Sequence, residues 1–252
     1  MNGYAAFLKK EFTENLKNCR FLILFAVFLI FGLASPFLAK FMPEILSSAA
    51  PDMRMGASPA ALDAWGQFYK NISGVGFSAL IILFGSCMSG EYSKGTLVLL
   101  ITKGMPRSAV IFAKYTAAAL LMTVCYWAGF LAACCGTTYL WPGAALPHIF
   151  TAAFYLWLIG FLYLSILLLC CVVFKQTFTS ILFTGGAAAV ISLLGTVEPL
   201  KKCNPFLLTS KNVKLISGAA SASEFLMPSV VSITVTIICL WSATILFDRK
   251  QL

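Results

Sequence analysis

The chain has 252 residues, of which 60% are hydrophobic and only 11% are charged, and its formal net charge is +9 at pH 7. A soluble domain is usually about a quarter charged, so this composition excludes the soluble globular class. The apolar runs are also too long and too uniform for the alternating strands of a membrane barrel. We therefore expect an all-α membrane protein with a single domain over residues 1–252.

The first segment, residues 3–20, has the pattern of an amphipathic helix. Tyr4, Leu8, Phe12 and Leu16 recur every four residues, and charged residues occupy the other sides. We expect this helix to lie at the cytoplasmic face of the membrane. A merely solvated leader is the alternative interpretation.

Six apolar runs are long enough to cross a bilayer, which takes about 20 residues in a helix. They cover residues 21–39, 72–90, 107–135, 149–174, 177–196 and 226–247. The first run is too long, and its leader too acidic, for a secretory signal peptide. The sequence thus predicts six transmembrane helices.

The distribution of basic residues predicts the orientation of these helices. Most of the 18 Lys and Arg residues fall in segments that share one side of the membrane with the N-terminus. Because cytoplasmic segments carry the excess of Lys and Arg, we expect a multi-pass protein of the bacterial plasma membrane with both termini in the cytoplasm. The four lysines of residues 197–225 weaken this bias.

Two longer segments, residues 40–71 and 197–225, are expected on the outer side. In the first, Ser58 can cap a helix whose first residue is Pro59. The second alternates short apolar pieces with lysines, so it either dips into the membrane as a hairpin or lies on the surface. Its "SASE" at 221–224 matches a capping box before the last span.

The spans lack the groups that membrane enzymes and ion-coupled carriers need. No Asp or Glu lies near the centre of a run, and we expect Lys114 to snorkel from the third span to the interface. The nine cysteines form no C-x-x-C motif, and His148 has no convergent partner in the sequence. We therefore expect no disulfide, metal site or cofactor.

Gly85 and Gly90 have the spacing of the glycines in a phosphate-binding loop, but the rest of the loop is missing. Glu91 stands where a lysine would bind phosphate, and Tyr92 stands where a Ser or Thr would hold magnesium. The loop therefore fails as a phosphate-binding site, and we expect that the chain is not an enzyme.

Residues 92–103, between the second and third spans, are predicted to form a short cytoplasmic helix. Gly104 can end it, and Pro106 can begin the next span. Leu97, Leu100 and Ile101 would form an apolar face and Lys94, Lys103 and Arg107 a basic one. A plain basic cytoplasmic loop is the alternative interpretation of this segment.

The stretch "GEYSKGTLVLLITKGMPRSAVIFAKY", residues 90–115, resembles the signature of type-2 (ABC-2) ABC transporter permeases. The resemblance rests on Glu91, Gly95-Thr96-Leu97, Pro106-Arg107 and Lys114. The segment before the first span resembles the N-terminal connecting helix of that family, and "NPF" at 204–206 resembles the segment before its last span. The resemblance covers essentially the whole chain.

The resemblance implies the membrane subunit of an exporter, driven by separate ABC ATPase subunits. The helix over 92–103 would be the coupling helix that docks into the ATPase. The residues implied in docking are Glu91, Gly95, Thr96, Leu97, Leu100, Lys103 and Arg107.

The family also implies a second permease copy or a homologous permease, facing spans two and five. Small residues one turn apart in the fifth span let helices approach closely, and they agree with such a contact. These residues are Gly185, Ala188, Ala189 and Ser192. The sequence does not distinguish a homodimer from a heterodimer. It also does not distinguish a drug, a peptide or a lipid as the exported substrate. The alternative function is a non-transporting membrane anchor or sensor for an ATPase.

Overall fold

The computed structural model describes residues 3–49, 59–102, 104–144, 146–198 and 202–250. Within these ranges every regular element is a helix, and six helical stretches are long and apolar enough to cross a membrane. They are Arg20–Met42, Ala61–Tyr92, Arg107–Leu140, Ile149–Val173, Thr177–Leu194 and Ala222–Arg249. The predicted all-α fold with six transmembrane helices is confirmed.

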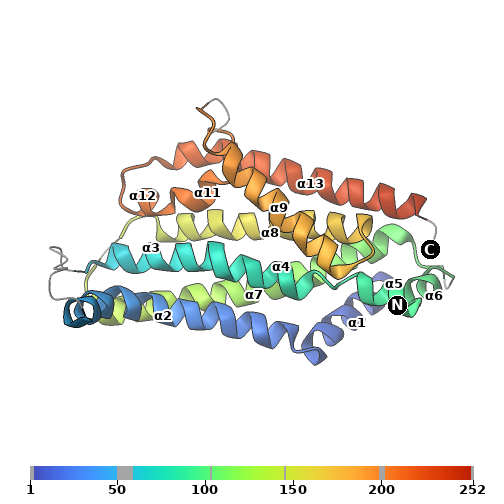
Figure 1. Ribbon diagram of the computed structural model, residues 1–252, viewed down its shortest axis with the longest axis horizontal. Coiled ribbons are helices and arrows are strands. Elements are labelled where there is room, and N and C mark those ends of the chain that lie inside the picture. Colours follow the sequence, from blue (N-terminus) through green and yellow to red (C-terminus); the bar gives the residue numbers. More distant parts are fainter. Residues whose placement is uncertain (1–2, 50–58, 103, 145, 199–201, 251–252) are drawn as a thin grey trace.

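The long helices run side by side along the long axis of the molecule (Figure 1). Helices α7 (Arg107–Leu140) and α8 (Ile149–Val173) form the centre of the bundle, whereas α9 (Thr177–Leu194) crosses its outside and is the least buried span. Both chain ends lie at the same end of the bundle, together with the short helices α5 (Ser89–Lys94) and α6 (Thr96–Thr102). We call this the terminal end, and the opposite one the distal end.

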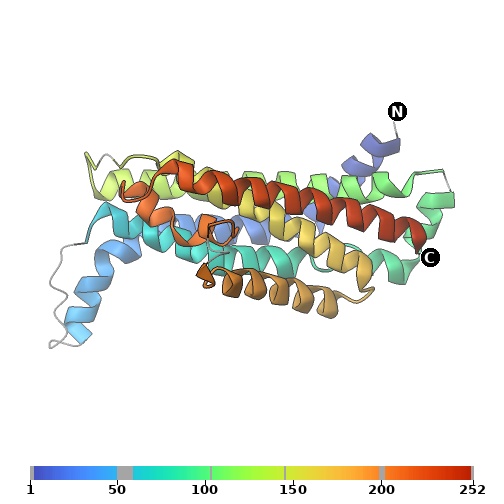
Figure 2. The same ribbon diagram turned by 90° about the horizontal axis from the view of Figure 1, so that it is seen from above.

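Helix α2 (Arg20–Ala49) packs along α7 with direct backbone contact. A Cβ atom placed on Gly32 would lie 2.2 Å from the carbonyl oxygen of Gly129, and one placed on Gly129 would lie 2.6 Å from the oxygen of Phe28. Only glycine allows this approach, which is typical of membrane helices that pack through small residues. Beyond the bundle, the last turns of α2 bend away at the distal end (Figure 2).

The second span is longer than predicted and irregular. It consists of α3 (Ala61–Asn71), a π-helical turn over Ile72–Gly76 and α4 (Phe77–Phe84), without a break between them. The predicted outer helix and the predicted span are therefore one continuous rod. The helix begins at Ala61, and its first turn is held by the Asp63 carboxylate, which accepts the Ala60 N–H at 2.9 Å. Ser58, the predicted cap, lies outside the described residues.

The segment after α9 folds back onto the bundle. Its short helices α11 (Leu207–Ser210) and α12 (Asn212–Ile216) pack against α8, and α12 also packs against α3. Leu208, Leu215 and Ile216 are fully buried there, so the segment is part of the protein core at the distal end.

The prediction of a capping box at residues 221–224 is wrong. Ser221 makes no side-chain capping bond to the 3₁₀ turn Ala222–Phe225 that precedes α13 (Leu226–Arg249). Instead the Ser221 hydroxyl pairs with Ser223, and the Glu224 carboxylate forms an ion pair with Lys211 at 3.0 Å. The Glu224 carboxylate, which the capping box requires, instead contacts Lys211 between α11 and α12, because that segment lies beside it.

The predicted N-terminal helix is present as α1 (Gly3–Lys17), packed against α7 and α2. Its buried face is not the predicted apolar stripe. Tyr4 and Leu16 stay exposed, whereas Phe7, Glu11 and Asn15 turn into the bundle. These three residues also recur every four positions, so α1 presents a largely polar face to α7.

Candidate functional site

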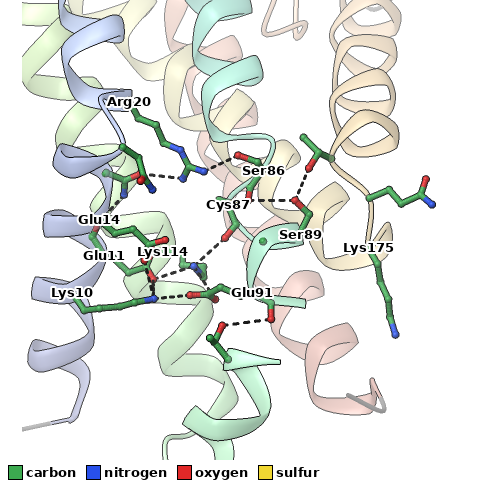
Figure 3. Close-up of a pocket in the computed structure, with 16 residues that line it drawn as sticks. Lys10, Glu11, Glu14, Arg20, Ser86, Cys87, Ser89, Glu91, Lys114 and Lys175 are labelled. Carbon is green, nitrogen blue, oxygen red and sulfur yellow. Dashed lines mark hydrogen bonds and ion pairs between the residues drawn. The ribbon is translucent and has the colours of Figure 1, made fainter. Parts of the chain in front are cut away.

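The polar face of α1 meets α5 and α7 in a network of charged side chains at the terminal end (Figure 3). Lys10 Nζ lies 2.8 Å from Glu91 Oε1, 3.2 Å from Glu11 Oε1 and 3.0 Å from Glu14 Oε2. Lys114 Nζ lies 3.1 Å from Glu11 Oε1 and 3.0 Å from Glu91 Oε2. Two ammonium groups thus bridge three carboxylates from α1 and α5.

The centre of this network is shielded from solvent. The side chains of Lys114, Glu11 and Glu91 expose only 3%, 7% and 9% of their surface. Lys114 also donates a hydrogen bond to the Cys87 carbonyl at 3.0 Å. The expected snorkelling of Lys114 is therefore wrong, because α1 folds across α7 and brings Glu11 to the ammonium group, which stays inside and paired.

Sequence reasoning singled out Glu91 and Lys114 but not Glu11. The available signal was the spacing of Phe7, Glu11 and Asn15, which lies beside the more obvious apolar stripe of the same helix. A carboxylate on a helix that precedes the first span is usually solvated. Only its docking onto α7 makes it a partner for Lys114.

The outer members of the network have shifted pKa values. Burial disfavours the charged form of Lys10, but its hydrogen bond to Glu91 and the nearby carboxylates dominate and raise the pKa of Lys10. Burial acts to raise the pKa of Glu14, but the hydrogen bond and the charge of Lys10 outweigh it, so the pKa of Glu14 is lowered. Both groups are therefore charged near neutral pH.

Glu11, Glu14 and Glu91 each place a carboxylate oxygen within 4.8 Å of the others, a separation that could hold a metal ion. Lys10 and Lys114 already supply the positive charge between these oxygens. A divalent cation would have to displace two paired ammonium groups, so the arrangement is that of a structural ion network.

A polar cavity of about 720 Å³ adjoins the network. On its α2 side, Arg20 donates hydrogen bonds to Asn15 Oδ1 at 3.3 Å and to Ser86 Oγ at 2.7 Å. On its α9 side, the hydroxyl groups of Ser89 and Thr177 lie 2.5 Å apart. These contacts join α1, α2, α5 and α9 around one space at the terminal end (Figure 3).

A comparison with protein-family models matches residues 5–251 to the family described as ABC-2 family transporter protein. The chain belongs to the ABC-2 transporter family. A comparison with curated proteins gave no match. Together with its six spans, this membership identifies a membrane-spanning permease of the ABC transporter type.

The predicted coupling helix of this ABC-2 permease is divided in two, so the expectation of one helix over 92–103 is wrong. Gly95 adopts a left-handed conformation with φ of 64° and ends α5, and α6 begins at Thr96. An L-residue with a side chain rarely adopts this φ. Gly95 therefore makes the corner between two short helices.

The residues expected to dock an ATPase lie in different environments. Leu97 is 1% exposed and packs into the core of the permease itself, whereas Leu100 is half-buried and Gly95 is exposed. Lys103 lies outside the described residues. Docking stays a prediction for this set, and in this conformation Leu97 stabilises the fold of α6.

Arg107 has a role in the ABC-2 fold that the sequence did not reveal. Its Nη1 lies 2.8 Å from each of the carbonyl oxygens of Phe247, Asp248 and Lys250. Phe247 and Asp248 lie in the last turn of α13, where carbonyls lack the usual i+4 donors, and Lys250 is the residue that follows the helix. The start of α7 is thereby joined to the end of the last span.

The small residues expected at a permease–permease contact lie on α9. Gly185 and Ala189 are exposed, Ala188 and Ser192 are partly exposed, and a Cβ atom on Gly185 would meet nothing within 4 Å. This side of α9 is therefore not covered by the described residues of the chain. The contact with a second permease stays a prediction.

Proposed function

We propose that this ABC-2 permease is the membrane subunit of an exporter for an amphipathic substrate, driven by a separate ABC ATPase that docks on α5 and α6. The proposal places the terminal end in the cytoplasm of a bacterial cell. The observation that carries it is the buried ion network, because Glu91 of α5 is held by Lys114 of α7 and by Lys10 of α1.

The network gives a docked motor a mechanical connection to the spans. A displacement of α5 and α6 would act through Glu91 on α7, which runs through the centre of the bundle. The same displacement would act on α7 through its first residue, Arg107, which holds the end of α13. Two independent contacts thus support the proposal that a movement of the α5–α6 corner reaches the third and sixth spans.

Pairing with a second permease is the other part of the proposal. The open side of α9 carries Gly185, Ala188, Ala189 and Ser192, which allow close helix approach. Gly85 and Gly90 lack the lysine and hydroxyl partners of a phosphate loop, so we assign ATP hydrolysis to the partner chain.

Co-purification with the ABC ATPase encoded nearest to this chain tests the proposal. Leu100→Asp should release the ATPase while the permease still accumulates, because a docked apolar contact would then bury an unpaired charge. Leu97→Asp should instead reduce accumulation, since Leu97 lies in the core. Ser217→Asp, on an exposed residue of the distal segment, is the matched control and should retain the ATPase.

Glu91→Gln should keep the ATPase bound but lower transport-stimulated ATP hydrolysis in proteoliposomes. A Leu100→Asp variant that keeps both the ATPase and full coupling would refute docking on α6. A wild-type complex that binds the ATPase without moving any lipid, peptide or drug probe would identify a membrane anchor.

A further inference from the structure

The cavity at the terminal end has a composition that suits a ligand. It lies between the corner of α1 and α2, the turn from α4 to α5, and the turn from α8 to α9. Its volume of about 720 Å³ is within the usual range of small-molecule pockets. Three kinds of polar group line it: charged side chains, hydroxyls and amides.

The charges that line the cavity are unequally satisfied. Glu11, Glu14 and Glu91 are each within 3.2 Å of a lysine ammonium group. Arg20 is different, because its guanidinium group donates only to the neutral oxygens of Asn15 and Ser86. Among the described residues no carboxylate lies within ion-pair distance of it, although the charge of Arg20 helps to lower the pKa of Glu14.

The neighbours of Arg20 are hydrogen-bond donors that suit an anion. Ser86, Ser89 and Thr177 contribute hydroxyl groups, and Asn18 and Gln176 contribute side-chain amides. A guanidinium group has five N–H donors in a planar fork that matches a phosphate or carboxylate. Figure 3 shows Arg20 directed from the start of α2 toward Ser86, across the side of the cavity away from the ion network.

Exposed apolar side chains lie within two helical turns of residues that line the cavity, Ser86 at the end of the second span and Thr177 at the start of α9. Helix α4 packs against both α2 and α9. Ile82 of α4 is 60% exposed, and Phe178 and Leu182 of α9 are 75% and 60% exposed. These side chains lie within helices that are long and apolar enough to span a membrane.

We propose that this cavity binds the phosphate-type headgroup of an anionic amphiphile, with Arg20 as its main contact and the apolar tail along α4 between α2 and α9. The binding itself is independent of the proposed function. Its interpretation as the binding of cargo rests on that function and narrows the substrate class to amphiphiles with an anionic headgroup.

Native mass spectrometry of the full chain, purified in detergent without any ATPase, tests the binding. The probes are phosphatidylglycerol, phosphatidylcholine and inorganic phosphate, each titrated alone. We expect phosphatidylglycerol to bind preferentially and Arg20→Gln to weaken it about tenfold, the loss of one charge-assisted contact. Arg20→Lys should weaken it less. Arg249→Gln, on an exposed arginine at the same end, is the matched control and should bind like wild type.

Three outcomes would overturn the proposal. Arg249→Gln could weaken phosphatidylglycerol binding as much as Arg20→Gln does, the two lipids could bind equally well, or Arg20→Gln could bind phosphatidylglycerol like wild type. Binding of inorganic phosphate as tightly as the lipid would overturn the amphiphile part and leave an anion site. If Arg20→Gln fails to accumulate, Ser86→Ala and Arg20→Lys decide, and both must weaken binding. Because no ATPase is present, failure of docking on α6 would not change these results.

Discussion

Lys114 and Glu91 form an ion pair of 3.0 Å in which the two side chains expose only 3% and 9% of their surface. The lysine belongs to α7, the third span, and the carboxylate to the short helix α5 at the end of the second. A buried ion pair contributes little net stability, but removal of one partner leaves a buried charge, which costs about 3–5 kcal/mol. This asymmetry makes the network testable by single and double substitutions.

We expect Lys114→Met to lower the thermal unfolding temperature in detergent more than Glu91→Gln does. Loss of Lys114 leaves Lys10 as the ammonium partner of three carboxylates, whereas loss of Glu91 leaves Lys114 paired with Glu11. The double variant should be more stable than Lys114→Met alone, because one uncompensated carboxylate is then removed.

The exposed pair of Lys211 and Glu224 is the control for this cycle. Its side chains are 29% and 47% exposed, so Lys211→Met should change stability by only about 0–1 kcal/mol. If the changes in unfolding temperature caused by Lys114→Met and Glu91→Gln simply add in the double variant, the coupling inferred for Lys114 and Glu91 is contradicted.

The outer ion pairs predict a broad pH plateau for the docking of α1. Glu14 has a lowered pKa, so its contribution is complete above the ordinary value of 4.5 and is lost as the pH falls through its folded pKa. Lys10 has a raised pKa, so its contribution is complete below 10.5 and is lost only above that value. Hydrogen exchange of the α1 amides between pH 4 and 8 should therefore show increased opening only at the acidic end, after correction for the intrinsic exchange rate. Glu14→Gln should reduce the increase in opening at acidic pH. If the increase is unchanged in this variant, groups other than Glu14 cause it.

The corner at Gly95 should resist substitution although it has space for a side chain. A Cβ atom there would meet nothing within 4 Å, but φ is 64°. Gly95→Ala should therefore cost about 1–2 kcal/mol from backbone strain alone. Gly90→Ala is the matched control, because it also has open space and lies inside α5 without a positive φ, so it should be neutral or slightly stabilising. Equal unfolding temperatures for the two variants would argue against the left-handed corner.

The backbone contact between α2 and α7 predicts a larger effect. Gly32→Ala and Gly129→Ala place a Cβ against the backbone of the opposite helix at 2.2 and 2.6 Å, and overpacking of this kind costs about 1–3 kcal/mol or more. Gly186→Ala, on the open side of α9, should leave the isolated subunit unchanged. Thermal unfolding in detergent compares the three, and tolerance of both buried substitutions would show that the helices lie further apart.

The six spans could be predicted from run length, since a bilayer requires a fixed length of apolar helix. The charge network could not, because it depends on the rotation of α1 against α7. The predicted stripe of Tyr4, Leu8, Phe12 and Leu16 and the buried face of Phe7, Glu11 and Asn15 are offset by one residue, about 100° around the helix. Hydrophobicity favours the first stripe, and the pairing of Glu11 with Lys114 selects the second.

Part of the α5–α6 corner was open to prediction and part was not. An isolated glycine inside a helical run, such as Gly95, weakens the helix and can mark its C-terminal end. The burial of Leu97 and the contact of Arg107 with α13 depend on elements far away in the chain. A local apolar or basic pattern gives no indication of which of its residues such elements will cover.

The three carbonyl groups that Arg107 binds lie 140 to 143 residues later in the chain. During synthesis the third span leaves the ribosome long before the sixth, so Arg107 reaches the membrane surface without its acceptors. The start of α7 can be anchored only when translation has passed Lys250. A chain interrupted in its last span would therefore leave the Arg107 guanidinium without these three acceptors.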